Sequence, residues 1–131
     1  MGLIYLDSCL LIYAIENHPA WAGHLHKTMV KQAAGSFAIS PLVKLECLVK
    51  PMKTGDLALQ QRYEAGLAQF VQLPMPETVF VQAAQLRARF GIKTPDALHL
   101  ACAQHHGCSA LWTNDERLAV AAHGLAWNVL A

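Results

Sequence analysis

Four acidic side chains stand at the ends or edges of apolar segments, where a carboxylate has little structural reason to be. Asp7 ends the first apolar run, Glu46 interrupts an apolar helical pattern, Asp96 opens another helical stretch, and Asp115 follows a late strand-like run. Only 9 of the 131 residues are acidic, so four in such positions is a large share. Hard carboxylate oxygens suit divalent cations, and cations held in this way cut phosphodiesters.

Short β-like runs alternate with amphipathic helical patterns, which predicts an α/β fold with a mostly parallel sheet. The predicted strands cover residues 3–6, 36–39, 71–73, 109–113 and 126–130. The predicted helices cover residues 10–16, 20–34, a stretch from 41, a stretch from about 56, 76–90, 94–107 and 115–122. The chain has no repeats and no long linker, so we expect residues 1–131 to form a single domain.

Cap and stop signals set the predicted helix ends. Ser40 is the predicted cap of the helix whose first residue is Pro41. Gly35 and Gly91 are predicted to end the helices that precede them. Asn114 is predicted to cap the short last helix.

The predicted sheet allows all four acids to face one cleft. Ligands of an open parallel sheet bind beyond the carboxyl ends of its strands, where Asp7 and Asp115 lie. Asp96 occupies the second position of its helix, where the helix dipole favours negative charge, and Glu46 lies at the edge of an apolar stripe. Two charges about 4 Å apart repel by roughly 4 kcal/mol at an effective dielectric near 20, so such a cluster raises the pKa values of its carboxyls or recruits a cation. Oxygen-only ligands favour magnesium or manganese over zinc.

Each acid also has an ordinary structural interpretation. Asp96 is explained as a favourable charge at a helix start, and Asp115 as a residue beside a helix cap. Glu46 is explained as the salt-bridge partner of Lys50, four residues further along the helix. Asp7 is the hardest to explain in this way, because a charge directly after a buried strand needs a partner. The joint arrangement therefore favours a cation site.

The bulk composition restricts the class of protein. A hydrophobic content of 54% with 15% charged residues excludes a disordered chain. No signal peptide is recognisable and no apolar run approaches the roughly 20 residues of a membrane span, so we expect a soluble, cytoplasmic protein without membrane contact. The four cysteines have no zinc-ribbon spacing and are expected to be reduced. The apolar share predicts an exposed partner surface, with four candidate contributors: Tyr5, Tyr13, Trp21 and Leu25.

Four segments of the chain resemble the acidic motifs of the PIN-domain family. They are Leu-Asp-Ser-Cys-Leu-Leu-Ile-Tyr at 6–13, the segment 40–46, Thr-Pro-Asp-Ala-Leu-His-Leu-Ala at 94–101, and Thr-Asn-Asp-Glu-Arg-Leu at 113–118. Their order and spacing are similar to those of the VapC toxins of bacterial toxin–antitoxin pairs. The resemblance implies a three-layer α/β/α fold with about four to five strands. It also implies an endoribonuclease that depends on one or two Mg²⁺ or Mn²⁺ ions.

The resemblance assigns the catalytic and metal-binding role to the four acids Asp7, Glu46, Asp96 and Asp115. Ser8 stands where the family usually has Thr or Ser, and Thr113 and Asn114 match the polar residues beside the last acid. Family members usually form homodimers and are inhibited by a small antitoxin protein whose tail covers the cleft. The family commonly has Asn where this chain has Cys9, and a thiol cannot make the same amide hydrogen bonds.

Hydrolysis at such a site would use a water that attacks in line with the scissile phosphate. Bound cations lower the pKa of the water and steady the departing oxygen, and a carboxylate takes the proton. Since the ribose 2′-hydroxyl does not attack, the products would carry 5′-phosphate and 3′-hydroxyl ends. Six basic residues are candidates for contacts to RNA phosphates, or else form solvated helix faces: Lys44, Lys50, Lys53, Arg87, Arg89 and Lys93.

Other functions fit the sequence less well. His99, His105 and His106 lie on one predicted helix near two cysteines, but their spacing matches no usual zinc pattern and helix packing explains them. A phosphatase of the haloacid-dehalogenase type needs a second Asp two residues after the first, where Cys9 stands. The main alternative is a catalytically weak PIN scaffold that acts by binding RNA or a protein partner.

Overall fold

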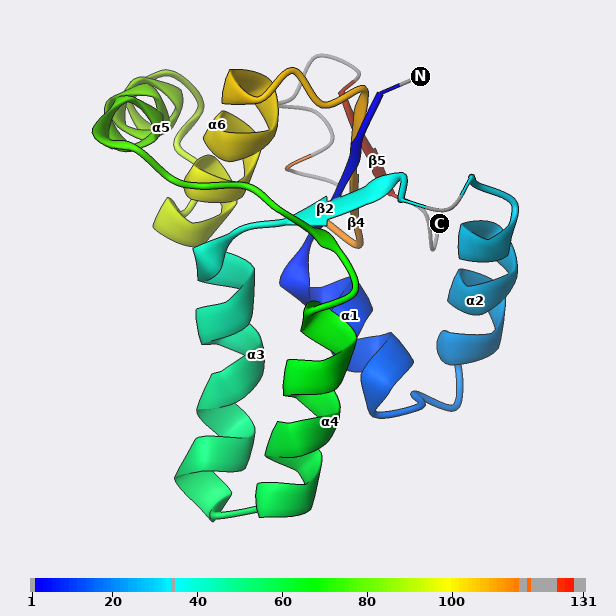
Figure 1. Ribbon diagram of the computed structural model, residues 1–131. Helices are drawn as coiled ribbons and strands as arrows, with labels where there is room; N and C mark the ends of the chain where they lie inside the picture. Colours follow the sequence, from blue (N-terminus) through cyan, green and yellow to red (C-terminus); the bar gives the residue numbers. More distant parts are fainter. Residues whose placement is uncertain (1, 34, 116–117, 119–124, 129–131) are drawn as a thin grey trace.

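The computed structural model describes residues 2–33, 35–115, 118 and 125–128 (Figure 1). Its strands are β1 (Ile4–Leu6), β2 (Phe37–Ile39), β3 (Val71–Gln72), β4 (Ala110–Thr113) and β5 (Ala126–Asn128). They form one parallel sheet in the order β3-β2-β1-β4-β5. The helices in this part of the chain are α1 (Ser8–Ile15), α2 (Ala22–Val30), α3 (Pro41–Thr54), α4 (Leu57–Leu67), α5 (Glu77–Phe90) and α6 (Thr94–His105).

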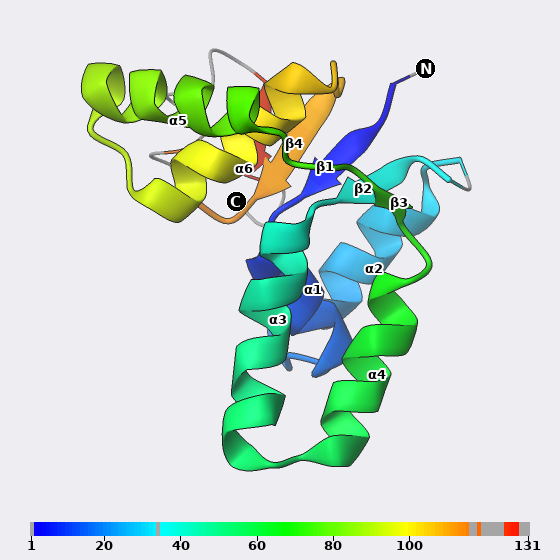
Figure 2. The same cartoon turned by 60° about the vertical axis from the view of Figure 1, so that its left-hand side comes forward.

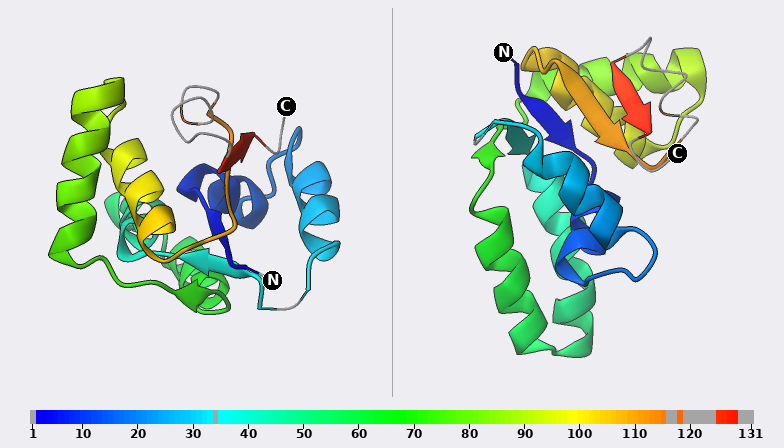
Figure 3. Two further views of the ribbon diagram at one scale, coloured as in Figure 1. Left: turned by 90° about the horizontal axis from the view of Figure 1, so that it is seen from above. Right: turned by 90° about the vertical axis from the view of Figure 1, so that its right-hand side faces the viewer.

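Helices cover both faces of the sheet, as the predicted three-layer fold requires. Seen from above, α5 and α6 lie on one side of the strands, and α1 and α2 lie on the other (Figure 3). The α3–α4 hairpin extends away from the sheet, with its two helices side by side (Figure 2). The prediction of a parallel α/β/α fold is confirmed, with five strands in the sheet.

The core is centred on β1 and α6. All three residues of β1 are buried, as expected for the middle strand of a parallel sheet that is covered on both faces. Helix α6 is buried over seven consecutive residues, 97–103, because it lies between the sheet and α5. These two elements carry Asp7 and Asp96 at or next to their ends, so the acids are attached to the most deeply packed part of the molecule.

Most predicted elements are confirmed with small shifts at their ends, but the predicted helix cap at Ser40 is wrong. Ser40 precedes Pro41 at the start of α3 as predicted, yet its side chain makes no cap hydrogen bond. The Ser40 hydroxyl instead lies 2.7 Å from the hydroxyl of Tyr5. Helix α2 is shorter than the predicted 20–34. Most of the predicted last helix and the end of the predicted last strand lie outside the described residues.

Exposed apolar side chains do not lie where the sequence analysis expected them. Tyr5 and Leu25 are both 0% exposed, so the prediction that they contribute to a partner surface is wrong. The large exposed apolar residues are Val30, Leu45, Val49, Met52, Leu57, Val71, Phe80 and Val81. Among the described residues, no helix is both long and apolar enough to cross a membrane.

Asp56 provides a test of the α3–α4 hairpin. Its carboxylate accepts a hydrogen bond of 3.0 Å from the backbone N–H of Leu59 and so caps α4. Asp56→Ala is expected to lower the free energy of unfolding by about 1 kcal/mol, as measured by urea denaturation. Asp56→Asn keeps a side-chain oxygen and should retain most of the stability. An equal decrease in the free energy of unfolding of both variants would contradict the assigned cap.

Candidate functional site

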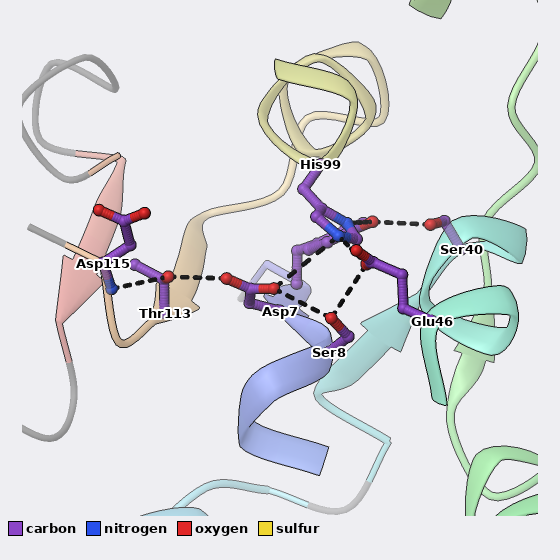
Figure 4. A network of polar contacts seen from close by, with 8 residues as sticks. Asp7, Ser8, Ser40, Glu46, His99, Thr113 and Asp115 are labelled. Carbon is purple, nitrogen blue, oxygen red and sulfur yellow. Dashed lines mark hydrogen bonds and ion pairs between the residues drawn. The ribbon is translucent and has the colours of Figure 1, made fainter. Parts of the chain in front are cut away.

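Asp7 lies between the end of β1 and the start of α1, and its carboxylate faces the strand ends. The Asp7 backbone N–H donates to the carbonyl of Trp112 (3.0 Å), and its side chain does not cap α1. Thr113 Oγ1 donates a 2.8 Å hydrogen bond to Asp7 Oδ2, and Ser8 Oγ lies 3.4 Å from Asp7 Oδ1. The buried carboxylate is therefore oriented by hydroxyl groups from β4 and α1 (Figure 4).

Glu46 reaches the same place from α3. Ser8 Oγ donates to Glu46 Oε1 at 2.9 Å, and His99 Nε2 lies 2.6 Å from the same oxygen. Partial burial favours the neutral acid, but the hydrogen bond and charge of His99 and the Ser8 hydroxyl outweigh it, so the pKa of Glu46 is lowered. The alternative pairing of Glu46 with Lys50 is wrong, because Lys50 Nζ lies 2.5 Å from Glu16 Oε1.

Asp96 and Asp115 complete the acidic cluster. Asp96 lies in the first turn of α6 and is partly buried. Burial, followed by the negative charges of Asp115, Asp7 and Glu46, raises the pKa of the Asp96 carboxyl. The Asp115 backbone N–H donates to Thr113 Oγ1 (3.1 Å), and Asp115 Oδ1 accepts from the backbone N–H of Leu118 at 3.4 Å. The structure thus brings the four sequence-predicted acids together at one edge of the sheet.

Asn114 is predicted to cap a last helix that lies mostly outside the described residues, so this cap stays a prediction. Within the described residues, the backbone N–H of Leu118 donates to Asp115 Oδ1. Asn114 Nδ2 donates to the Tyr13 hydroxyl at 3.3 Å. Ser8 and Thr113 contact the acids directly, whereas the hydrogen bond of Asn114 links β4 to α1.

His99 is the residue that the sequence analysis missed. It is 1% exposed, and its Nε2 lies 3.8 Å from Asp7 Oδ1 as well as close to Glu46. Potential ligand atoms of Asp7, Glu46 and His99 all lie within 4.8 Å of one another. Helix packing alone therefore does not explain this histidine. The available signal was its position three residues after Asp96, which places both side chains on one helix face.

Cys9 occupies the position next to this cluster on α1. Burial, and then the negative charge of Asp7, raises the pKa of its thiol. The side chain therefore stays neutral and adds no further negative charge beside Asp7. The cluster keeps all four carboxylates despite the difference from the usual family residue.

A sequence profile of the PIN domain matches residues 4–124. The chain belongs to the PIN-domain family. No curated protein sequence matches it.

Several solved structures with a similar fold are described as toxins or as complexes of toxin–antitoxin systems. A toxin–antitoxin complex from Klebsiella pneumoniae has a TM-score of 0.79 at 21% identity, covering 96% of this chain and 97% of that one. VapBC2 from Rickettsia felis bound to a promoter DNA fragment has a TM-score of 0.76 at 18% identity, covering 95% of this chain and 97% of that one. Mycobacterium tuberculosis VapC20, described as a Sarcin-Ricin loop cleaving toxin, has a TM-score of 0.76 at 14% identity, with 90% and 94% covered. At these identities the likeness shows a shared PIN fold.

The six basic candidates of this PIN domain are all exposed, but three of them have structural partners. Lys50 is engaged in the ion pair described above. Arg87 Nε donates to the carbonyl of Ile92 (3.1 Å), and the Arg89 guanidinium lies 5.4 Å from the centre of the Phe90 ring. The other three are Lys44, Lys53 and Lys93. Their contact with RNA remains a prediction.

Asp96→Asn is expected to stabilise the metal-free PIN domain at neutral pH. Because the pKa of Asp96 is raised in the folded state, the unfolded chain ionises this carboxyl at lower pH than the folded chain does. The contribution of Asp96 to the free energy of unfolding therefore falls as pH rises from about 4 through the folded pKa, and stays reduced above it. Thermal unfolding in EDTA should show a higher melting temperature for the variant, and its difference from wild type should widen from acidic to neutral pH.

Glu77→Gln is the matched control for this measurement. Glu77 is an exposed acid in the first turn of α5, so its neutralisation removes a similar favourable interaction with a helix start. It relieves no cluster of carboxylates and should not stabilise the protein. An Asp96→Asn variant less stable than wild type at neutral pH would show that repulsion within the cluster is small.

Proposed function

We propose that this PIN domain is a metal-dependent endoribonuclease and the toxin of a VapC-type toxin–antitoxin pair. The observation that carries the proposal is that Asp7 and Glu46 share the Ser8 hydroxyl at one edge of the sheet, where Asp115 is joined to Asp7 through Thr113 and Asp96 is close enough to interact with the charges of all three. Structural roles do not require such a concentration of like charge, whereas a divalent cation offsets it. RNA is the proposed substrate because a similar structure is described as a Sarcin-Ricin loop cleaving toxin.

The donor set suits a hard cation. Asp7, Glu46, Asp96 and Asp115 offer carboxylate oxygens, which favour Mg²⁺ or Mn²⁺, and we assign these residues to hold one or two ions. Burial, and then the negative charges of the neighbouring acids, raises the pKa of Asp96, and a bound cation would offset both effects. When bound, the metal supplies charge stabilisation at the scissile phosphate and lowers the pKa of the attacking water.

The residues around the acids prepare the site for hydrolysis. Thr113 and Ser8 hold the Asp7 carboxylate in one orientation, so that no reorganisation is needed when the substrate binds. We assign acceptance of the proton of the water to a carboxylate oxygen of the cluster. Water, and not the ribose 2′-hydroxyl, is the proposed nucleophile, so the products carry 5′-phosphate and 3′-hydroxyl ends. Lys44, Lys53 and Lys93 are the exposed cations proposed to contact RNA phosphates.

We also propose that the protein forms a homodimer and binds a small antitoxin in the cytoplasm. Leu45, Val49 and Met52 form an exposed apolar stripe on α3, the helix that carries Glu46. Contiguous exposed apolar surface of this kind marks a site of protein association. Several similar structures are toxin–antitoxin complexes, which supports a partner of that class.

Cleavage of a structured RNA pool tests the nuclease. The wild-type protein is expected to cut RNA with Mg²⁺ or Mn²⁺ and to stop cutting in EDTA, leaving 5′-phosphate ends. Asp7→Asn and Asp96→Asn should each reduce the rate by a factor on the order of 100 or more, because each removes a charged ligand. The readout is the rate of appearance of new ends, mapped by ligation that requires a 5′-phosphate.

Asp56→Asn is the control for these substitutions. It makes the same chemical change at the exposed cap of α4, outside the cluster, and should leave the rate unchanged. Cutting that survives EDTA and both cluster substitutions would show that the four acids do not form the active site. Tight RNA or protein binding without any cutting would favour the alternative of a catalytically weak scaffold.

A further inference from the structure

Behind the acids, a buried chain of hydrogen bonds leads from Ser40 to Glu46. The Tyr5 hydroxyl lies 2.7 Å from Ser40 Oγ and 2.7 Å from His99 Nδ1. On the other side of the ring, His99 Nε2 lies 2.6 Å from Glu46 Oε1. Ser40 and Tyr5 are 0% exposed and His99 is 1% exposed, so no water competes for these bonds. Figure 4 shows the His99 ring beside Glu46 and Ser40, with Asp7 below it.

The chemistry of the groups sets the direction of this chain. An ionised carboxylate only accepts hydrogen bonds, so His99 Nε2 carries the proton that it shares with Glu46. Nε2 donates to Glu46 whether the ring is neutral or protonated. In the neutral ring Nδ1 accepts from the Tyr5 hydroxyl and the Tyr5 oxygen accepts from Ser40, whereas in the protonated ring Nδ1 donates to the Tyr5 oxygen. Every buried polar side-chain atom of the described residues has a partner, as this arrangement requires.

We infer that His99 is a positioning residue, which holds Glu46 in the acidic cluster through its Nε2–H and is itself held by Tyr5 and Ser40. The inference deepens the proposed function and rests on it, because it concerns the placement of a proposed metal ligand. A glutamate side chain loses considerable rotamer freedom when it is ordered, and the Glu46 side chain is 27% exposed. His99 and Ser8 together restrict the Glu46 carboxylate before any ion arrives.

A direct ligand role for His99 makes a different prediction. A nitrogen that binds a metal needs a free lone pair, so Nε2 would lose its proton and Nδ1 would donate to Tyr5. The observed contact of Nε2 with a carboxylate favours the protonated Nε2 of a positioning residue. Mg²⁺ and Mn²⁺ prefer oxygen ligands, which agrees with this assignment. The two roles are separated by which nitrogen carries the proton when the metal is bound.

Mn²⁺ binding to the metal-free protein, followed by electron paramagnetic resonance, tests the positioning role without using nuclease activity. His99→Asn places its amide near the position of Nδ1 and cannot reach Glu46, so it should weaken Mn²⁺ binding about 10- to 100-fold. His99→Gln extends its amide nitrogen to the position of Nε2 and should restore most of the affinity. His105→Gln, on the exposed side of the same helix, is the control and should bind as wild type does.

Nitrogen-15 NMR of the wild-type imidazole adds a measurement that needs no substitution. With Mg²⁺ bound, the His99 ring is expected to keep its proton on Nε2, whereas a proton found only on Nδ1 would overturn the positioning role in favour of a ligand. Tyr5→Phe keeps the ring of residue 5 but removes the hydroxyl that holds His99, and it should weaken Mn²⁺ binding relative to wild type. This variant provides a second affinity test if His99→Asn does not fold, and an affinity equal to that of wild type would count against the role of Tyr5 in holding His99.

The possible failures have separate signatures. A wild-type protein that binds neither Mn²⁺ nor Mg²⁺ would contradict the proposed function. A wild-type protein that binds Mn²⁺, together with a folded His99→Asn variant of equal affinity, would overturn the positioning role alone. Equal weakening by His99→Asn and His99→Gln would also overturn it, because restoration by Gln depends on the hydrogen bond to Glu46.

Discussion

Asp7 and Glu46 share the hydroxyl of Ser8 at the edge where the parallel strands end, and most of the local structure follows from holding these charges together. Like charges about 4 Å apart repel by roughly 4 kcal/mol at an effective dielectric near 20. Donors from several elements offset this repulsion: Thr113 binds one oxygen of Asp7, and His99 binds Glu46. Within the described part of the chain no hydrogen bond offsets the charge of Asp96, and burial, followed by the charges of Asp115, Asp7 and Glu46, raises the pKa of its carboxyl.

The strand order explains why these groups meet. β1 lies between β2 and β4, and its last residue, Leu6, pairs with Trp112, so the next residues along the two strands, Asp7 and Thr113, are neighbours. The loop after β2 leads directly into α3, which brings Glu46 to the same edge from the other side of β1. A parallel sheet with β1 at its centre thus gathers residues that lie far apart in the sequence.

The sequence could predict the elements that carry the acids, because strand ends and helix starts are marked by local patterns of apolar residues, Pro and Gly. It could not predict the partners of the buried polar groups. Ser40 has the residue type and position of a helix cap, but its hydroxyl forms a hydrogen bond with the nearby Tyr5 hydroxyl instead. Lys50 has the spacing for a pair with Glu46, but α1 presents Glu16 to it instead. Both outcomes depend on how α1, α3 and β1 pack, and this packing is not encoded in local spacing.

Fold stability by itself does not require the polar chain of Ser40, Tyr5 and His99. Burying hydroxyl and imidazole groups removes them from water, and their hydrogen bonds largely compensate for this loss without a large net gain. Apolar residues of similar volume often fill such a space with equal or greater stability. The chain ends on Glu46, at the cluster and not within the core, so its effect is exerted on the position of that carboxylate. A network that adds little to stability but restricts one proposed ligand is best explained by the requirements of the site.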